Sequence, residues 1–485
     1  MEKESYYNST RLLWLVFIVT IIRYYYISPL TYATNFQLFF DEAQYWTWSK
    51  NLDFGYFSKP PIIAWLLYGV TSIFGDSTFA IKLASPIIHA AIAMVIYLIG
   101  KELTNSKTSF WGAIIYLTLP SVTAASAFIS SDTPLLFFWS ISLLFFIKAL
   151  DSPNSLYWLA MGISVGLGLM SKYTMIAFYP SIGLYLLFTK ECRKYLFGAS
   201  LWIAVGLSAV IFAPNILWNY ANDFISFAHN KENVLSNGTS YNISLMLEFI
   251  ASQFGVFGPI LFATLLWILP DYRNYTKDRE GSFLFYTTFT LLIVAIIFSF
   301  ISGAQAHWAA PAYISGSLLI AHYFINLKKK TSILRFSTYF HIICAIIFFH
   351  INFIYPIITP NKNPLERIER WNILADETSK ILQNYKNTYL FTDERKSVAI
   401  LMYRLKDEHG NPYPVLKWNS DKKPDDYYDI ITDMNEYKKQ NFIFSTRTSS
   451  ILSFHPFFEK IELLKTIDIH GKKFFIYHMT NFKGY

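Results

Sequence analysis

Residues 281–327 contain no Asp, Glu, Lys or Arg, and this uncharged run is the strongest constraint that the sequence places on the fold. It is far longer than the roughly 20 apolar residues that a helix needs to cross about 30 Å of hydrocarbon. Further apolar runs follow one another along most of the chain, which is 53% hydrophobic and only 15% charged. Soluble proteins usually carry about 25% charged residues. The sequence therefore predicts a polytopic α-helical membrane protein.

Windows of about 20 apolar residues predict about eleven transmembrane helices. Two long runs are divided at polar breaks: residues 152–189 at Lys172, their single charge, and residues 281–327 at the segment SGAQAHW. Residues 60–75 are apolar but short, so we expect a re-entrant or surface-lying helix there. The expected spans begin near residues 12, 80, 109, 133, 154, 173, 196, 248, 282, 306 and 336.

The chain has a net charge of +8, and its basic residues gather in alternate loops between the apolar runs. Such clusters indicate cytoplasmic loops by the positive-inside rule, so we expect no nucleic-acid partner. The residues predicted to be cytoplasmic are Lys101, Lys107, Lys148, Lys190, Arg193, Lys194, Arg273, Lys277, Arg279, Lys328, Lys329, Lys330 and Arg335. The segments predicted to lie outside are residues 33–79, 128–134, 171–174, 215–247, 302–308 and everything after about residue 356.

The last part of the chain has a different composition, rich in Lys, Asp, Glu and Asn, with strand-like runs such as NTYLFTD and KKFFIYHM. We therefore expect a transmembrane domain over residues 1–355, whose first outer loop, residues 33–79, carries juxtamembrane helices. Residues 356–485 are expected to form a small soluble α/β domain on the outer face.

Two adjacent acids, Asp41 and Glu42, follow the first apolar run on the predicted outer side. A charge at membrane depth costs several kcal/mol and usually faces a cavity, so such residues are functional candidates. If residues 40–49 are helical, Asp41 and Tyr45 share one face of that helix. A carboxylate there can act as a general base, bind a metal or hold a cationic group. Equally, the acids can simply complement the positive end of the helix dipole.

Lys59 stands directly before Pro60 and Pro61 in the segment FSKPP. Proline favours extended backbone in the residue before it, which presents the lysine ammonium group rigidly, and such a group binds phosphate. The alternative is a snorkelling lysine that contacts lipid headgroups. Asp132, in the segment SSDTP, is a further candidate, although an acid before TP also suits a helix cap.

Further cations on the predicted outer side are Lys172 in SKYT, His307 in AQAHWAAPAY, and Lys82. Small residues around His307 allow helices to approach closely. Snorkelling is the simpler alternative for Lys82, and a structural hydrogen bond is the simpler alternative for His307. Together with the acids and the many aromatic residues, these cations predict one outward-facing cavity. Such a cavity suits a lipid-linked phosphate that carries a polar head such as a sugar.

Several segments occur in a characteristic order over about residues 10–320: DEAQYWTWSKNLDFGYFSKPPIIAWLL, FGDSTFAIKLASPIIHA, SSDTPLLFF, GLGLMSKYTMI and AHWAAPAY. In this order they resemble the bacterial family 39 glycosyltransferases, GT-C enzymes related to protein O-mannosyltransferases and to the lipid A aminoarabinose transferase. The resemblance implies a polyprenyl-phosphate sugar donor and inverting transfer on the periplasmic face of the bacterial inner membrane. It also implies that Asp41, with Glu42 beside it, is the catalytic acidic position, Lys59 the basic position and Asp132 the second acidic position.

The forms LDFGYFSKPPIIAWL and HWAAPAY resemble the branch that adds sugars, uronic acids included, to lipopolysaccharide core and lipid A. We therefore expect lipid A, lipopolysaccharide core or another envelope glycan as acceptor, with membrane lipids around the enzyme. The alternatives are a protein O-glycosyltransferase of the same family, a lipid-linked sugar flippase and an envelope sensor. A divalent metal stays open, because the acids and the histidine include metal-ligand types without a tight spacing. The expected substrate-binding residues are Tyr45, Lys59, Lys82, Asp132, Lys172, His307 and Trp308.

Overall fold

The computed structural model describes residues 6–29, 37–235, 241–358, 363–385, 387–407 and 410–485. The chain divides into two compact units. We call them the helical unit (Met1–Thr34, Lys59–Ile63 and Lys82–His350) and the sheet unit (Asn35–Ser58, Ala64–Ile81 and Ile351–Tyr485). Most of the predicted first outer loop therefore groups with the C-terminal residues, while the segment that contains Lys59 groups with the helical unit.

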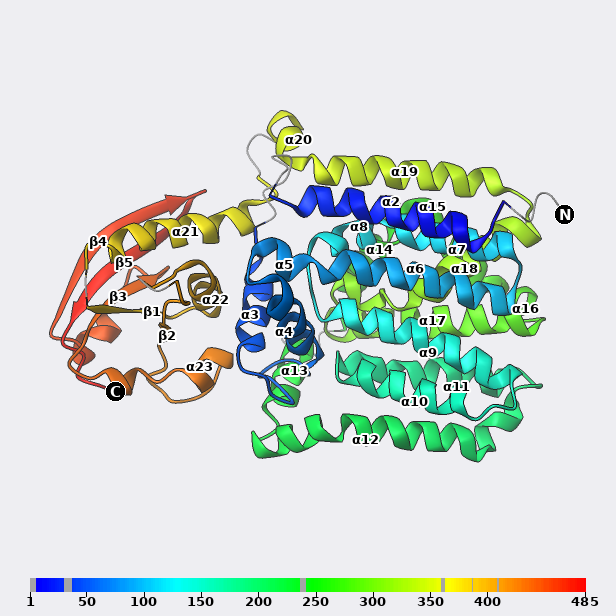
Figure 1. The fold of residues 1–485 in the computed structure, drawn as a ribbon, viewed down its shortest axis with the longest axis horizontal. Helices are drawn as coiled ribbons and strands as arrows, with labels where there is room; N and C mark the ends of the chain where they lie inside the picture. The colour runs from blue at the N-terminus through cyan, green and yellow to red at the C-terminus, as the bar shows by residue number, and fades with distance from the viewer. Residues whose placement is uncertain (1–5, 30–36, 236–240, 359–362, 386, 408–409) are drawn as a thin grey trace. The chain divides into compact units, whose positions relative to one another are not determined.

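Six helices among the described residues are long and apolar enough to cross a membrane, as the composition predicts (Figure 1). They are α2 (Ser9–Ile27), α5 (Thr78–Lys82) together with α6 (Ala84–Leu103), α9 (Asp132–Asp151), α12 (Ala199–Ala221), α17 (Arg279–Ser302) and α19 (Thr331–Phe349). Shorter apolar helices are α4 (Ile62–Phe74), α10 (Leu156–Leu169), α11 (Phe178–Phe188), α14 (Ile243–Val256) and α18 (Ala312–His322). The total of about eleven spans stays a prediction, because helices of 10–17 residues do not settle whether they cross.

Large apolar side chains cover the outward faces of several of these helices. Trp14 on α2, Val210 on α12 and Phe336 on α19 are all exposed. A helix of a water-soluble protein turns its polar face outward, whereas lipid accepts an apolar one. The distribution of apolar side chains therefore agrees with helices that lie in a membrane.

One predicted span is broken in the middle. Helices α7 (Ser106–Thr118) and α8 (Pro120–Ala127) meet at an angle of 55°, because Pro120 has no N–H to continue the helix. The carbonyl groups that the break leaves without helical partners find polar side chains instead: Arg23 Nη2 donates to Leu117 O over 2.6 Å. At the far end of α8, Lys82 Nζ donates to Ala127 O over 2.9 Å. These bonds fix α8, which leads directly into α9 and Asp132.

The C-terminal residues form the predicted small α/β structure, built on a five-stranded sheet with the order β2-β1-β3-β5-β4. The strands are β1 (Thr388–Thr392), β2 (Val415–Lys417), β3 (Asn441–Thr446), β4 (Lys460–Ile469) and β5 (Lys472–Thr480). Strand β1 pairs in parallel with β2 and β3, and β5 pairs antiparallel with β3 and β4. The runs NTYLFTD and KKFFIYHM contain β1 and β5, as their composition predicts. The accompanying helices are α21 (Glu366–Leu382), α22 (Arg395–Arg404) and α23 (Tyr427–Ile431).

Within the sheet unit, helix α3 (Phe40–Ser49) packs against the C-terminal residues through its aromatic side chains. Trp48 stacks on Tyr56 at 4.7 Å and meets Tyr427 edge-on at 5.9 Å between ring centroids. Trp46 meets Tyr403 of α22 edge-on at 5.2 Å. The helical segment over 40–49 is confirmed. Its tryptophans are buried in protein, so they anchor α3 to the C-terminal residues.

Replacing Trp48 by Ala should destabilise the sheet unit by about 3–5 kcal/mol, because a fully buried indole leaves a cavity that its neighbours fill only in part. We expect a lower unfolding temperature in detergent and faster proteolysis of the C-terminal residues. Trp267→Ala, which removes an exposed indole from α15 (Pro259–Ile268), is the matched control and should change neither quantity. Equal shifts in the two variants would contradict the packing described here.

Candidate active site

Three of the predicted site residues meet inside the helical unit, although they are far apart in the chain. Lys172 Nζ donates to Asp132 Oδ1 over 2.7 Å, and His307 Nε2 lies 3.6 Å from Asp132 Oδ2. The Lys172 and Asp132 side chains are 12% and 20% exposed, so this ion pair is largely shielded from water. Lys59 lies close enough for its charge to act on both Asp132 and His307. We call these four residues the cationic cluster.

Asp132, Lys172 and His307 each lie at a helix end or in a turn between helices. Asp132 is the first residue of α9, and its helix N-cap, Ser131, makes no side-chain capping bond. The Asp132 carboxylate bonds Lys172 rather than capping α9, so capping does not explain this acid. Lys172 has an extended backbone between α10 and the short 3-10 helix Tyr173–Ala177.

The turn that carries His307 is held by buried polar groups that the sequence reading did not single out. Helix α17 ends at Gly303, whose φ of 84° favours glycine, and a short 3-10 helix, Ala306–Ala309, follows. Gln253 Nε2 of α14 donates to Ala306 O over 3.1 Å, and Tyr313 Oη donates to Gln253 Oε1 over 2.6 Å. A glutamine within an apolar helix, such as Gln253, is a sequence signal for such a residue, because a buried side-chain amide needs hydrogen-bond partners.

The cationic cluster has a net positive charge, because its two lysines face one carboxylate. Desolvation lowers the pKa of His307, and the nearby charges of Lys172 and Lys59 lower it further against the opposing pull of Asp132. The lowered pKa favours the neutral imidazole, which can still donate or accept a hydrogen bond. Positive charge in a site shielded from water favours an anionic ligand.

Asp41 and Glu42 lie in the sheet unit and have different surroundings. Glu42 is buried, and its carboxylate accepts the Phe39 N–H over 2.9 Å at the start of α3. Asp41 is 37% exposed, and its Oδ1 lies 3.3 Å from Nη2 of Arg395. Arg395 also donates to Gln44 Oε1. The acid at position 41 therefore presents its carboxylate at the surface of the unit, while the acid at position 42 stabilises the helix start.

The other predicted binding residues lie apart from the cluster or beside it. Lys82 is fully buried, with its ammonium group bonded to Ala127 O and 4.4 Å from the centre of the Phe128 ring. Tyr45 is buried in the sheet unit against Trp48. Trp308 follows His307 in the same turn and is half-buried, with its N–H donating to Gln305 O. Among the described residues, no three His, Cys, Asp or Glu side chains gather closely enough to hold a metal ion.

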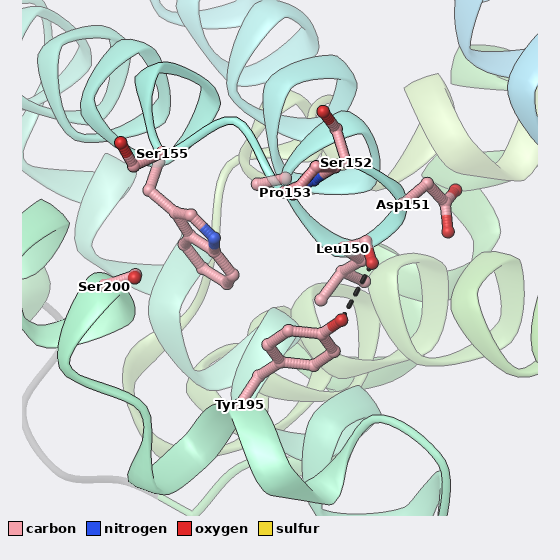
Figure 2. Close-up of a pocket in the computed structure, with 9 residues that line it drawn as sticks. Leu150, Asp151, Ser152, Pro153, Ser155, Tyr195 and Ser200 are labelled. Atoms are coloured by element: carbon pink, nitrogen blue, oxygen red, sulfur yellow. Dashed lines mark hydrogen bonds between the residues drawn. The ribbon is translucent and has the colours of Figure 1, made fainter.

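A separate cavity of about 380 Å³ lies at the other end of α9 (Figure 2). Its lining includes Asp151, Ser155 and Tyr195, and Tyr195 Oη donates to Leu150 O over 2.8 Å. Because α9 has 20 residues, Asp132 and this cavity are roughly 30 Å apart. The cavity is therefore not part of the cationic cluster.

Comparisons with known proteins place this chain in a family. Residues 58–218 match the family model described as dolichyl-phosphate-mannose-protein mannosyltransferase. Lipid A galacturonosyltransferase RgtD of Rhizobium johnstonii is 34% identical over 384 residues, which cover 77% of this chain and 79% of that protein. The chain belongs to the family 39 glycosyltransferases. As a member of that family it is an enzyme, which sets aside the flippase and sensor alternatives.

Other members are more distant. Lipopolysaccharide core galacturonosyltransferase RgtB of Rhizobium johnstonii is 24% identical over 293 residues, covering 58% of this chain and 59% of that protein. The crystal structure of ArnT from Cupriavidus metallidurans bound to undecaprenyl phosphate has a TM-score of 0.65 and 13% identity, and covers 97% of this chain and 98% of that chain. At that identity the likeness shows the fold alone, and it confirms the predicted GT-C architecture.

Removing one partner of the Lys172–Asp132 pair should cost far more stability than removing one partner of an ion pair at the surface. Lys172→Met leaves the shielded Asp132 carboxylate without its closest cation, which typically costs about 3–5 kcal/mol. We expect a clear fall in the unfolding temperature in detergent, largely restored in the double variant Lys172→Met with Asp132→Asn.

Lys148→Met is the matched control, since Lys148 lies on α9, the helix that Asp132 begins, and pairs with Glu102 where both side chains are about a third exposed. Such exposed pairs contribute about 0–1 kcal/mol. A fall of the same size in Lys148→Met would show that the cluster is not shielded as described.

Proposed function

We propose that this glycosyltransferase moves a uronic acid from a polyprenyl-phosphate donor to lipid A or lipopolysaccharide core on the periplasmic face of the bacterial inner membrane. The observation that carries the proposal is the cationic cluster, because its net positive charge suits the phosphate of a lipid-linked sugar. The name of the 34% identical relative, lipid A galacturonosyltransferase, supports the choice of a uronic acid and of lipid A. The undecaprenyl phosphate of the ArnT structure supports a donor with a polyprenyl carrier.

The proposed reaction is a displacement at the anomeric carbon of the donor sugar. An acceptor oxygen attacks that carbon from one side while the bond from the carbon to the phosphate oxygen breaks on the other, which inverts the configuration. The leaving phosphate keeps the bonding electron pair and gains negative charge. Lys59 and Lys172 supply fixed positive charge for that phosphate, and such preorganised charge is often the largest single contribution to catalysis.

Asp41 is proposed as the acidic residue of the reaction because it occupies the family's acidic position and presents an exposed carboxylate. Where the acceptor is a hydroxyl group, Asp41 accepts its proton as the acceptor oxygen attacks. Where the acceptor is a phosphate of lipid A, the attacking oxygen is already an anion, and Asp41 orients the substrate instead. The buried Glu42 is bonded to the helix start, so we assign it a structural role in placing its neighbour.

The distribution of charge along α9 supports the proposed periplasmic location. Its Asp151 end adjoins basic residues, since Asp151 pairs with Arg279 and Lys148 lies one turn earlier. The loop Lys190–Lys194 and the segment Lys328–Lys330 belong to the same predicted basic set. The positive-inside rule favours a cytoplasmic location for this end, and we therefore propose that the Asp132 end faces outward.

Asp41→Asn should lower sugar transfer by about 10²–10⁴-fold with a hydroxyl acceptor, because the amide cannot take the proton. The measurement is the mass spectrum of lipid A from cells that lack the chromosomal gene and express either the native chain or the variant. Native chain should add the mass of a hexuronic acid to lipid A, and the variant should not.

Asp53→Asn is the matched control, since Asp53 is an exposed acid of the same segment whose carboxylate accepts the Phe54 N–H. It should support normal modification at normal membrane levels of protein. Normal modification by Asp41→Asn would remove Asp41 from the proposed mechanism, and lipid A unchanged by the native chain would refute the proposed acceptor.

A further inference from the structure

The sheet unit places an arginine from the C-terminal residues on the candidate catalytic acid. Arg395 is the first residue of α22, and its Nη2 lies 3.3 Å from Asp41 Oδ1. Both side chains are about a third exposed, so a substrate can reach the pair. We infer that Arg395 is a positioning residue that holds the Asp41 carboxylate in its working orientation, so that the C-terminal residues contribute directly to the active site. This inference rests on the proposed role of Asp41.

The guanidinium group of Arg395 is itself held in place from a second direction. It donates through Nη1 to the amide oxygen of Gln44, which lies on α3 one turn after Asp41 and is buried. A buried amide oxygen needs a donor, so Gln44 fixes where the guanidinium lies. The planar guanidinium offers several donors in a rigid fork, and can therefore bond an amide oxygen and a carboxylate at once.

The acids next to Arg395 in the sequence are already engaged elsewhere. The Asp393 carboxylate accepts a hydrogen bond from Thr446 Oγ1 over 2.8 Å. Glu394 pairs with Arg447 at 3.6 Å between the charged atoms. With both neighbours so engaged, Asp41 is the carboxylate within ion-pair distance of Arg395 among the described residues.

The helices that carry the pair are locked to each other, which lets Arg395 act as a fixed point. Tyr403, two turns further along α22, donates to Asp76 O over 3.0 Å and packs edge-on against Trp46 of α3. Tyr428 Oη donates to Thr47 Oγ1 of α3 over 3.4 Å. The alignment of Asp41 therefore depends on a rigid assembly of α3, α22 and α23.

The test is a double-mutant cycle on transfer kinetics with the full-length protein in detergent, a lipid-linked uronic acid donor and a lipid A acceptor. Arg395→Gln should lower kcat about 10- to 100-fold with KM changed less than threefold, since misaligning a reacting group by about 1 Å costs about this much. Arg395→Lys should recover part of the rate, because an ammonium group can still bond the carboxylate. Asp41→Asn with Arg395→Gln should be no slower than Asp41→Asn alone, since the two residues act as one group.

Arg404→Gln is the matched control, because Arg404 ends the same helix and pairs with Asp376 at 2.8 Å, away from α3. It should keep native kinetics, and all variants should keep the native unfolding temperature to within about 2 °C. Losses that multiply in the double variant, or equal losses in Arg395→Gln and Arg404→Gln, would overturn the role of Arg395. Full activity of Asp41→Asn would instead overturn the proposed function of Asp41, so the two failures are distinguishable.

Discussion

The hydrogen-bonded ion pair between Lys172 and Asp132 is the interaction on which the rest of the helical unit's site depends. Either charge alone at the edge of an apolar helix bundle would be costly, and each makes the other acceptable. The pair also fixes two helix ends against each other, because Asp132 begins α9 and Lys172 follows α10. Lys172 already balances the charge of the Asp132 carboxylate. The ammonium group of Lys59 therefore leaves the cluster with a net positive charge that a ligand can use, and His307 adds a further polar group.

In the sheet unit, packing holds helix α3, which carries Asp41, against the C-terminal residues. Helix α3 is short, and a helix of ten residues is marginal by itself in water. Its stability comes from burying Trp46 and Trp48 against aromatic residues contributed by the C-terminal part of the chain. The same packing brings Arg395 to Asp41. A C-terminal region that looks like an appendage in the sequence therefore supports Asp41, the proposed catalytic acid.

Much of this architecture is predictable because lipid imposes a simple constraint. The apolar windows predict the long helices, and the charges that interrupt them indicate Asp132, Lys172 and His307, which the fold brings together. The periodicity of residues 40–49 shows which side chains share a face but not what covers that face, so the burial of Tyr45 could not be foreseen.

Lys82 illustrates the same limit. Its ammonium group bonds Ala127 O, the last carbonyl of the short helix that Pro120 begins, and the sequence does not show where that helix ends. Snorkelling and substrate binding are the two roles that the sequence alone predicts for this lysine. Arg395 was missed because it lies 351 residues from Gln44 in a polar stretch without a motif. Contacts of that separation follow from tertiary packing, which local patterns do not encode.

We propose that the cationic cluster binds the phosphate of a lipid carrier. The most direct measurement compares the affinity of the purified protein for undecaprenyl phosphate and for undecaprenol, which has the same chain without the phosphate. The native protein should bind the phosphate at least tenfold more tightly, a difference of about 1.4 kcal/mol. That preference should disappear when Lys59 and Lys172 are both replaced by Met, with Asp132→Asn included to avoid an unpaired acid. Equal affinity of the native protein for the two lipids, or an unchanged preference in the variant, would contradict the account.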